Sequence, residues 1–155
     1  MIRMSKFADY GLVLMTQFLR ASSAEENLSA RELASQTRLP LPMVSKVLKA
    51  LTREGLLVSH RGASGGYSLS RSPAKISVAE VLTAVEGPIA MTECLDSTSV
   101  CKQESVCPVR TNWERINFAV QDVLDAISLA DMLEPLPDHL VTLGVGETET
   151  PSHRQ

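Results

Sequence analysis

Hydrophobic residues recur every three or four positions in five segments of the chain, which is the spacing of an amphipathic helix. These segments predict helices over residues 5–20, 29–37, 42–55, 77–87 and 108–132. The second and fourth segments begin with a serine followed three residues later by a glutamate, the pattern of a capping box. Between the third and fourth, two short β-prone runs flank the stretch "GASGG", which predicts a β-hairpin. The chain is therefore predicted to be mainly α with a small β-hairpin wing.

The order of these elements is that of a winged helix-turn-helix: a helix, a short helix, a tight turn, a helix and a hairpin with a glycine tip. A helix fits the major groove of B-DNA, and the residues at its N-terminal end lie nearest the base edges. The hairpin is placed to reach a phosphate or the minor groove. We expect DNA contacts from the turn, the third helix and the wing, at Thr37, Arg38, Pro42, Ser45, Lys46, Lys49, Arg61 and Gly62.

The chain has a net charge of −3, but its charges are unevenly distributed. Residues 31–75 carry eight bases and two acids, a balance of +6, whereas residues 76–155 carry four bases and thirteen acids, a balance of −9. Local charge rather than net charge meets a phosphate backbone. A solvated basic face would explain the charge equally well, but the basic segment coincides with the predicted helix-turn-helix and wing. We therefore expect double-stranded DNA as a partner.

The last predicted helix carries a heptad-like apolar seam, which needs a partner surface. Packing on its own domain is the alternative, but so long a helix has little of that domain left to cover it. We expect a homodimer whose seam contains Trp113, Ile116, Val120, Val123 and Ile127. The chain is then divided into a winged helix-turn-helix domain over 1–90, a cysteine loop over 91–107, a dimerisation helix over 108–133 and a disordered tail over 134–155.

All three cysteines of the chain fall in one polar stretch, "CLDSTSVCKQESVCPVR", at residues 94–110. The N-terminus shows no export signal and no segment is apolar enough to span a membrane, so a reducing cytoplasm is expected. Clustered cysteines there more often bind metal or do redox work than form disulfides. Thiolates suit zinc or iron–sulfur clusters, yet both normally take four protein ligands and the loop supplies three. A zinc site and free redox thiols remain alternatives.

The wing "RGASGGYSLSR", the helix "ISVAEVLTAVEGPI" and the three cysteines after it resemble the Rrf2 family of bacterial winged-helix regulators, which includes IscR and NsrR. The stretches "EGPIAMTEC" and "CPVRTNWERIN" are most similar to the branch that regulates the SUF iron–sulfur assembly operon. The resemblance covers residues 1 to about 132. It implies a homodimer with crossed long helices and one metal site per subunit beside the wing.

The resemblance also shows where this sequence departs from its relatives. In IscR-like members a histidine three positions after the last cysteine completes a two-iron site; here that position is Arg110, which has no lone pair to give. In NsrR-like members a carboxylate on the partner's first helix completes a four-iron site, and Asp9 matches that position. The expected ligands are Cys94, Cys101, Cys107 and, as candidate fourth, Asp9 of the partner subunit. An outside thiol, solvent or no fourth group stays open, and so does the choice between [2Fe-2S] and [4Fe-4S].

The function predicted from these features is that of an iron–sulfur cluster-sensing, DNA-binding transcriptional regulator of a SUF-type assembly operon. A zinc-based, thiol-based or nitric-oxide-responsive repressor of the same fold is the alternative. The sequence contains no Ser/His/Asp set, Walker loop or dinucleotide fingerprint, so an enzyme is not expected.

Overall fold

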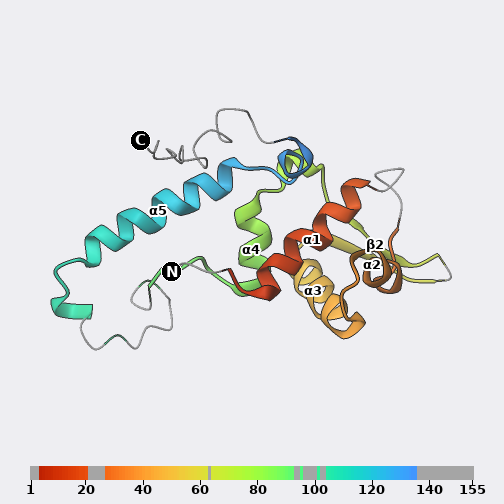
Figure 1. The fold of residues 1–155 in the computed structure, drawn as a ribbon, viewed down its shortest axis with the longest axis horizontal. Coiled ribbons are helices and arrows are strands. Elements are labelled where there is room, and N and C mark those ends of the chain that lie inside the picture. The colour runs from red at the N-terminus through yellow and green to blue at the C-terminus, as the bar shows by residue number, and fades with distance from the viewer. Residues whose placement is uncertain are drawn as a thin grey trace, which may run out of the picture.

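The computed structural model describes residues 4–20, 27–62, 64–92, 95, 101 and 104–135. Its main elements are α1 (Lys6–Arg20), α2 (Ala30–Thr37), α3 (Leu41–Arg53), β1 (Leu57–His60), β2 (Gly66–Leu69), α4 (Val78–Glu86) and α5 (Arg110–Ala126) (Figure 1). Short 3-10 turns lie at η1 (Pro73–Lys75), η3 (Glu104–Val106) and η4 (Asp131–Leu133). The predicted class, mainly α with a two-stranded hairpin, is confirmed. Most of the tail predicted to be disordered, residues 136–155, lies outside the described residues.

Two helices begin with the capping boxes that the sequence predicted. At α2 the backbone N–H of Glu32 donates to Ser29 Oγ (3.2 Å), and the N–H of Ser29 donates to Glu32 Oε2 (2.7 Å). The same reciprocal pair forms at α4 between Ser77 and Glu80, at 2.9 and 3.1 Å. The N–H and then the hydroxyl of Ser29 hold the pKa of Glu32 below its ordinary value. The third helix starts one residue earlier than expected, so that Pro42 is its second residue.

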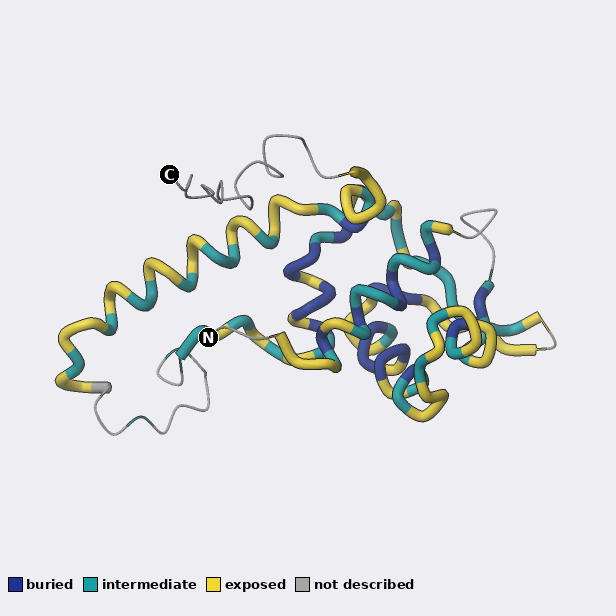
Figure 2. The backbone as a smooth tube through the Cα atoms, in the orientation of Figure 1, coloured by how far each residue is buried: buried dark blue, intermediate teal, exposed yellow. Residues whose placement is uncertain are grey.

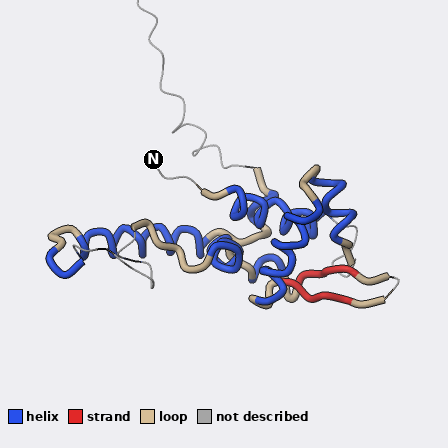
Figure 3. Tube along the Cα trace, turned by 90° about the horizontal axis from the view of Figure 1, so that it is seen from below, coloured by secondary structure: helices blue, strands red, loops and turns tan. Residues whose placement is uncertain are grey.

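The wing is an antiparallel pair in which His60 lies opposite Gly66 (Figure 3). At the tip Gly62 has φ +109°, a left-handed conformation that favours glycine. The second strand also pairs with the segment before α2, through N–H to O bonds of 3.0 and 2.9 Å between Leu28 and Tyr67. A Cβ at Gly66 would lie 2.8 Å from the carbonyl oxygen of Leu28, so this close approach requires glycine. The base of the wing is thereby attached to the helix-turn-helix.

The hydrophobic core lies between α1, α3 and α4, with the base of the wing closing one side (Figure 2). Its fully buried side chains come from α1, α2, α3, β1, α4 and the residue just before the α4 cap, and include Leu14, Met15, Leu33, Val44, Val47, Leu48, Leu51, Leu57, Ile76 and Val81. Because α3 buries one face in this core, its opposite face is held toward solvent.

The long helix α5 projects from the body formed by α1 to α4, and none of its residues is buried (Figures 1 and 2). It ends at Ala126, whereas the apolar spacing predicted a helix to Met132. The chain turns at this point because Leu129 enters the main core, where its exposed fraction is 0%. Tertiary burial therefore overrides the continuing helical pattern.

The residues after α5 are tied to the start of α4 by backbone pairing. The N–H of Leu129 donates to the carbonyl oxygen of Ile76 (2.7 Å), and the N–H of Val78 donates to that of Ile127 (2.9 Å). The hydroxyl of Ser77 also donates to Asp125 Oδ1 at 3.0 Å. The C-terminal end of α5 is therefore an integral part of the body.

Replacing Leu129 by alanine is expected to lower the free energy of unfolding by about 2–5 kcal/mol, the cost of a large-to-small change at a fully buried site. Urea unfolding at one fixed protein concentration measures this loss. The matched control is Leu133→Ala, because Leu133 is 43% exposed in the following turn and its truncation should cost little. Equal losses in the two variants would show that Leu129 contributes no special anchoring.

Candidate DNA interface and cysteine site

The exposed face of α3 carries the polar residues that the sequence assigned to DNA. Pro42, Lys46 and Lys49 are exposed and Ser45 is half-buried. The helix begins at Leu41, so Pro42 and Ser45 lie in its first turn and a half, the part that an inserted helix brings nearest the base edges.

The turn between α2 and α3 depends on an unusual backbone conformation. Arg38 has φ 57° and ψ 27°, and among the described residues it is the one non-glycine with positive φ. Such a conformation costs an L-residue about 1–2 kcal/mol. Its side chain is exposed, whereas the hydroxyl of the neighbouring Thr37 donates to the carbonyl oxygen of Leu33 (2.7 Å). Of this pair, Arg38 is therefore better placed for a phosphate.

Arg61 and Gly62 are exposed at the far end of β1, as expected of wing residues that approach DNA. The structure adds a neighbour to which the sequence assigned no role. His60 Nε2 lies 2.8 Å from Ser68 Oγ, which orients the imidazole on the outward face of the hairpin. Its position next to Arg61 was the signal available in the sequence.

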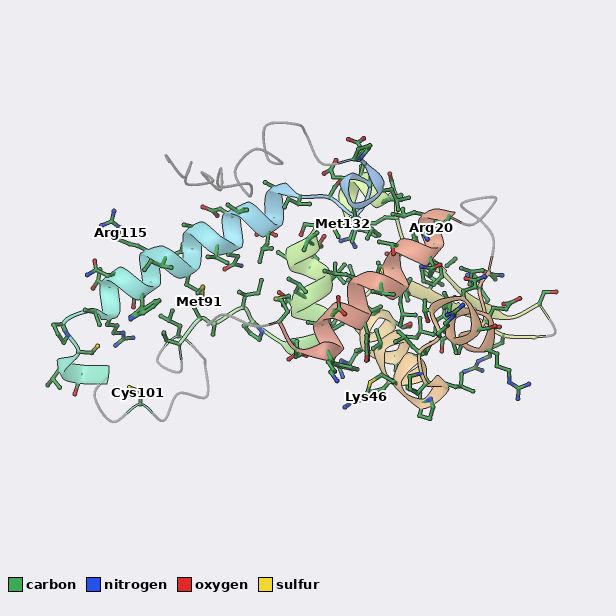
Figure 4. The ribbon with its side chains drawn as sticks, in the orientation of Figure 1. Arg20, Lys46, Met91, Cys101, Arg115 and Met132 are labelled. Atoms are coloured by element: carbon green, nitrogen blue, oxygen red, sulfur yellow. The ribbon has the colours of Figure 1, made fainter. Side chains whose placement is uncertain are left out.

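The two described cysteines lie in the connection before α5, and Cys94 lies outside the described residues. Cys101 and Cys107 are both half-buried, and Figure 4 shows Cys101 near the N-terminal end of α5, away from the body. Among the described residues, no three histidine, cysteine or acidic side chains come together as a metal site. Two accessible thiol groups in a polar connection suit the soft ligation of an iron–sulfur cluster, with the remaining ligands still to be supplied.

The residue at the position of the IscR-like histidine takes part in the helix instead. Arg110 is the first residue of α5, and its backbone N–H donates to the carbonyl oxygen of Cys107 at 3.4 Å. Its Nε lies 3.3 Å from Glu114 Oε1 one turn later. The side chain therefore pairs along the helix with an acidic residue and offers no ligand to a metal.

The segment leading to the cysteine loop is held against the middle of α5. Asn117 Nδ2 donates to the carbonyl oxygen of Ile89, and the N–H of Met91 donates to Asn117 Oδ1, both at 3.0 Å. Figure 4 shows Met91 beside the long helix. One amide side chain thus connects the start of the loop to the middle of α5.

Asp9, the candidate fourth ligand, is exposed in the first turn of α1. That turn is capped by Ser5, whose Oγ accepts from the N–H groups of Phe7 and Ala8 at 3.1 Å each. The hydroxyl of Ser5 in turn donates to Glu86 at the end of α4. The carboxylate of Asp9 is accessible to a second subunit.

The predicted dimer seam is divided between two environments. Trp113 and Val120 are half-buried, whereas Ile116, Val123 and Ile127 are 44%, 61% and 36% exposed. A shallow groove of about 360 Å³ lies beside the exposed residues and is lined by Asn112, Arg115, Ile116 and Ala119. Ile116 and Val123 lie seven residues apart on one face of α5, and with Ile127 just after the helix they form an exposed apolar stripe that needs cover.

The helix order, the exposed basic face of α3 and the glycine-tipped hairpin define a DNA-binding protein of the winged helix-turn-helix class. A model of the Rrf2 family, described as iron-dependent transcriptional regulators, matches residues 4–135. The chain therefore belongs to the Rrf2 family and is a transcriptional regulator, not an enzyme. None of the described helices is long and apolar enough to cross a membrane.

Similar proteins include regulators with different names. The chain is 31% identical over 131 residues to the transcriptional regulator CymR of Bacillus subtilis, covering 84% of this chain and 89% of that one. Among solved structures, IscR of T. potens has a TM-score of 0.67 and 27% identity, covering 89% of this chain and 90% of that chain. CymR, the global cysteine regulator of B. subtilis, has a TM-score of 0.66 and 29% identity, with 85% and 96% covered.

Proposed function

We propose that this protein is an iron–sulfur-responsive transcriptional regulator that binds operator DNA as a homodimer and controls a SUF-type assembly operon in the cytoplasm. The observation that carries the proposal is the position of the cysteines. All three precede the long helix within one polar stretch, and two of them are half-buried outside the core of the body. The family's description as iron-dependent supports the same interpretation.

DNA binding follows from the shape and charge of the body. The first turns of α3 enter the major groove, where Ser45 is placed to contact a base edge and Lys46 and Lys49 to contact phosphates. Arg38 approaches the backbone from the turn, and Arg61 reaches a phosphate or the minor groove from the wing. Each positive side chain that neutralises a phosphate makes the affinity fall more steeply with salt.

The homodimer forms through the exposed apolar stripe of α5. A two-fold pair of these helices covers Ile116, Val123 and Ile127 in both subunits, because a symmetric interface uses the same patch twice. It also sets the distance between two recognition helices, whose half-sites lie about 34 Å apart on one face of DNA.

The cluster would be held by Cys94, Cys101 and Cys107, with Asp9 of the partner subunit as the proposed fourth ligand. When bound, an iron–sulfur cluster supplies a centre that is gained or lost with iron supply and oxidants. Within the chain, Asn117 connects the loop to α5, and the Ser5–Glu86 hydrogen bond connects the end of α4 to the start of α1. Filling the site would therefore act on the dimer helix and on the body together.

The response requires that the cluster bind more tightly to one of two arrangements of the dimer than to the other. A tenfold change in operator binding corresponds to about 1.4 kcal/mol of coupling between the cluster site and the DNA site. The hydrogen bonds of Asn117 can supply a coupling free energy of this size, since one hydrogen bond contributes about 0.5–1.5 kcal/mol net to stability.

A second candidate function keeps the DNA interface and makes the cysteines a zinc or thiol switch. Arg110 favours it, because this side chain stands where a histidine ligand stands in IscR-like relatives and cannot bind a metal. The half-exposed Cys101 and Cys107 are accessible to oxidants or to a metal ion.

The decisive experiment is an anaerobic purification followed by visible spectroscopy, metal analysis and sulfide analysis. We expect a brown protein with iron and sulfide in equal amounts, and an operator affinity that changes about tenfold or more when the cluster is removed by a chelator. The operator is selected from the promoters of the host and from random DNA. A colourless protein with stoichiometric zinc would favour the second candidate, and equal affinity before and after removal would defeat cluster sensing.

A further inference from the structure

A lysine of the recognition helix contacts an aromatic ring of the first helix. Lys46 Nζ lies 4.8 Å from the centroid of the Phe7 ring, within the range of a cation–π interaction. It is the one such contact found among the described residues. Figure 4 shows Lys46 at the junction between α3 and α1. The sequence predicted Lys46 as a DNA contact and gave no sign of a connection to Phe7.

Phe7 is held by the packing of its side chain and by the cap of α1. It packs against the main core, and its backbone N–H donates to Ser5 Oγ at 3.1 Å. The hydroxyl of Ser5 also donates a hydrogen bond to Glu86 at the end of α4. Core packing therefore holds the ring and the cap holds its backbone, whereas the side chain of Lys46 is exposed.

We infer that Phe7 is a positioning residue for DNA binding, which holds the ammonium group of Lys46 toward a backbone phosphate beside α3. A free lysine side chain has four rotatable bonds and loses this freedom on binding. The ring face restrains the ammonium group before DNA arrives and leaves its other N–H donors available to a phosphate. The inference rests on the proposed DNA interface of α3.

The contact also directs Lys46 away from the base edges. Phe7 belongs to α1, which lies beside α3, so the ammonium group is drawn sideways from the recognition helix toward its flank. Phosphate contacts fix the register and orientation of a protein on DNA without reading its sequence. Lys46 therefore contributes equally to the affinity and salt dependence of binding to every DNA sequence. Selectivity for particular bases depends on Ser45 and its neighbours.

The test is a double-mutant cycle that uses Phe7→Leu, Phe7→Tyr and Lys46→Met, with operator affinity measured by fluorescence anisotropy over a range of KCl concentrations. Phe7→Leu should weaken binding about two- to fivefold, the size of an exposed cation–π contact. Phe7→Tyr should bind like the parent, since a phenol ring keeps the π face. In the Lys46→Met background Phe7→Leu should weaken operator binding no further. The slope of log affinity against log salt concentration should be smaller by about the contribution of one phosphate contact.

The matched control is Tyr10→Leu, because Tyr10 is a half-buried aromatic of the same helix packed against the same core. Its effect should be the same with and without Lys46. Thermal melts check that each variant folds, and Phe7→Met replaces Phe7→Leu if the leucine variant unfolds.

A loss from Phe7→Leu that is equal in both backgrounds would reduce Phe7 to a packing residue and overturn the inference, as would no loss at all. A parent protein whose operator binding shows no salt dependence would instead contradict the proposed DNA interface itself. The two failures are therefore distinguishable.

Discussion

Val123→Asp is expected to convert the dimer to monomers. Val123 is 61% exposed on the apolar stripe of α5, so the aspartate is tolerated by a single chain but is buried without a partner when two stripes meet. Each unpaired buried charge costs roughly 3 kcal/mol or more, and two-fold symmetry places two in one interface. The dissociation constant of the dimer should rise by at least about 10³-fold.

The affinity for the operator should fall when the dimer dissociates, because each subunit then binds one half-site without a linked second subunit. The loss of linked binding is expected to be about 10²-fold or more. Sedimentation equilibrium measures the oligomeric state, and anisotropy with a two-half-site operator measures the affinity.

Phe118→Asp is the matched control for this prediction. Phe118 is 65% exposed on the same helix, but five residues before Val123 it points about 140° away around the helix axis. The control should remain dimeric and bind the operator normally. A dimer that survived Val123→Asp, or that was lost equally in Phe118→Asp, would place the subunit contact on another surface.

Cys101→Ala is expected to abolish iron and sulfide binding while leaving the dimer folded. An iron–sulfur cluster held by three cysteines of this chain loses one of its thiolates, and no other cysteine exists to replace it. Cys101 is half-buried in the loop and does not belong to the hydrophobic core, so its truncation should cost little stability. Visible absorption and metal analysis of anaerobic protein test this directly, and operator affinity should equal that of the cluster-free parent.

Ser105→Ala is the control for this second change, since Ser105 is an exposed residue of the same loop between Cys101 and Cys107. It should keep the colour and the operator response. Full iron content in Cys101→Ala would remove this cysteine from the ligand set. Stoichiometric zinc in the parent that is lost in Cys101→Ala would favour the zinc switch.

Elements with local signals were predictable from the sequence. Both capping boxes formed as predicted, because Ser29 and Ser77 each need only a glutamate three residues later. The hairpin formed between the β-prone runs, and Gly62 has the positive φ that its tip requires. The inward residues of α3 were also predictable, since Val47, Leu48 and their neighbours follow the helical period.

Features that depend on contacts distant in sequence were not predictable. The apolar spacing of α5 continues through Ile127 and Ala130, and nothing local shows that Leu129 is drawn into the core by pairing with Ile76. The contact between Phe7 and Lys46 is likewise absent from any local pattern, because it depends on how two helices pack. The proposed ligands of the cysteine site include a residue of a second subunit. The sequence of one chain does not show which residues two subunits bring together, so the full ligand set was not predictable.

The return of the chain into the body after α5 determines which fragments of this protein can be made. A fragment cut just before α5 would lack Leu129 and would leave the carbonyl oxygen of Ile76 without the amide that pairs with it. Exchanging dimer helices between related regulators at such a boundary would damage the DNA-binding half of the chimera. The smallest autonomous unit of this regulator therefore extends through η4, and the linear order of its domains does not describe how it can be divided.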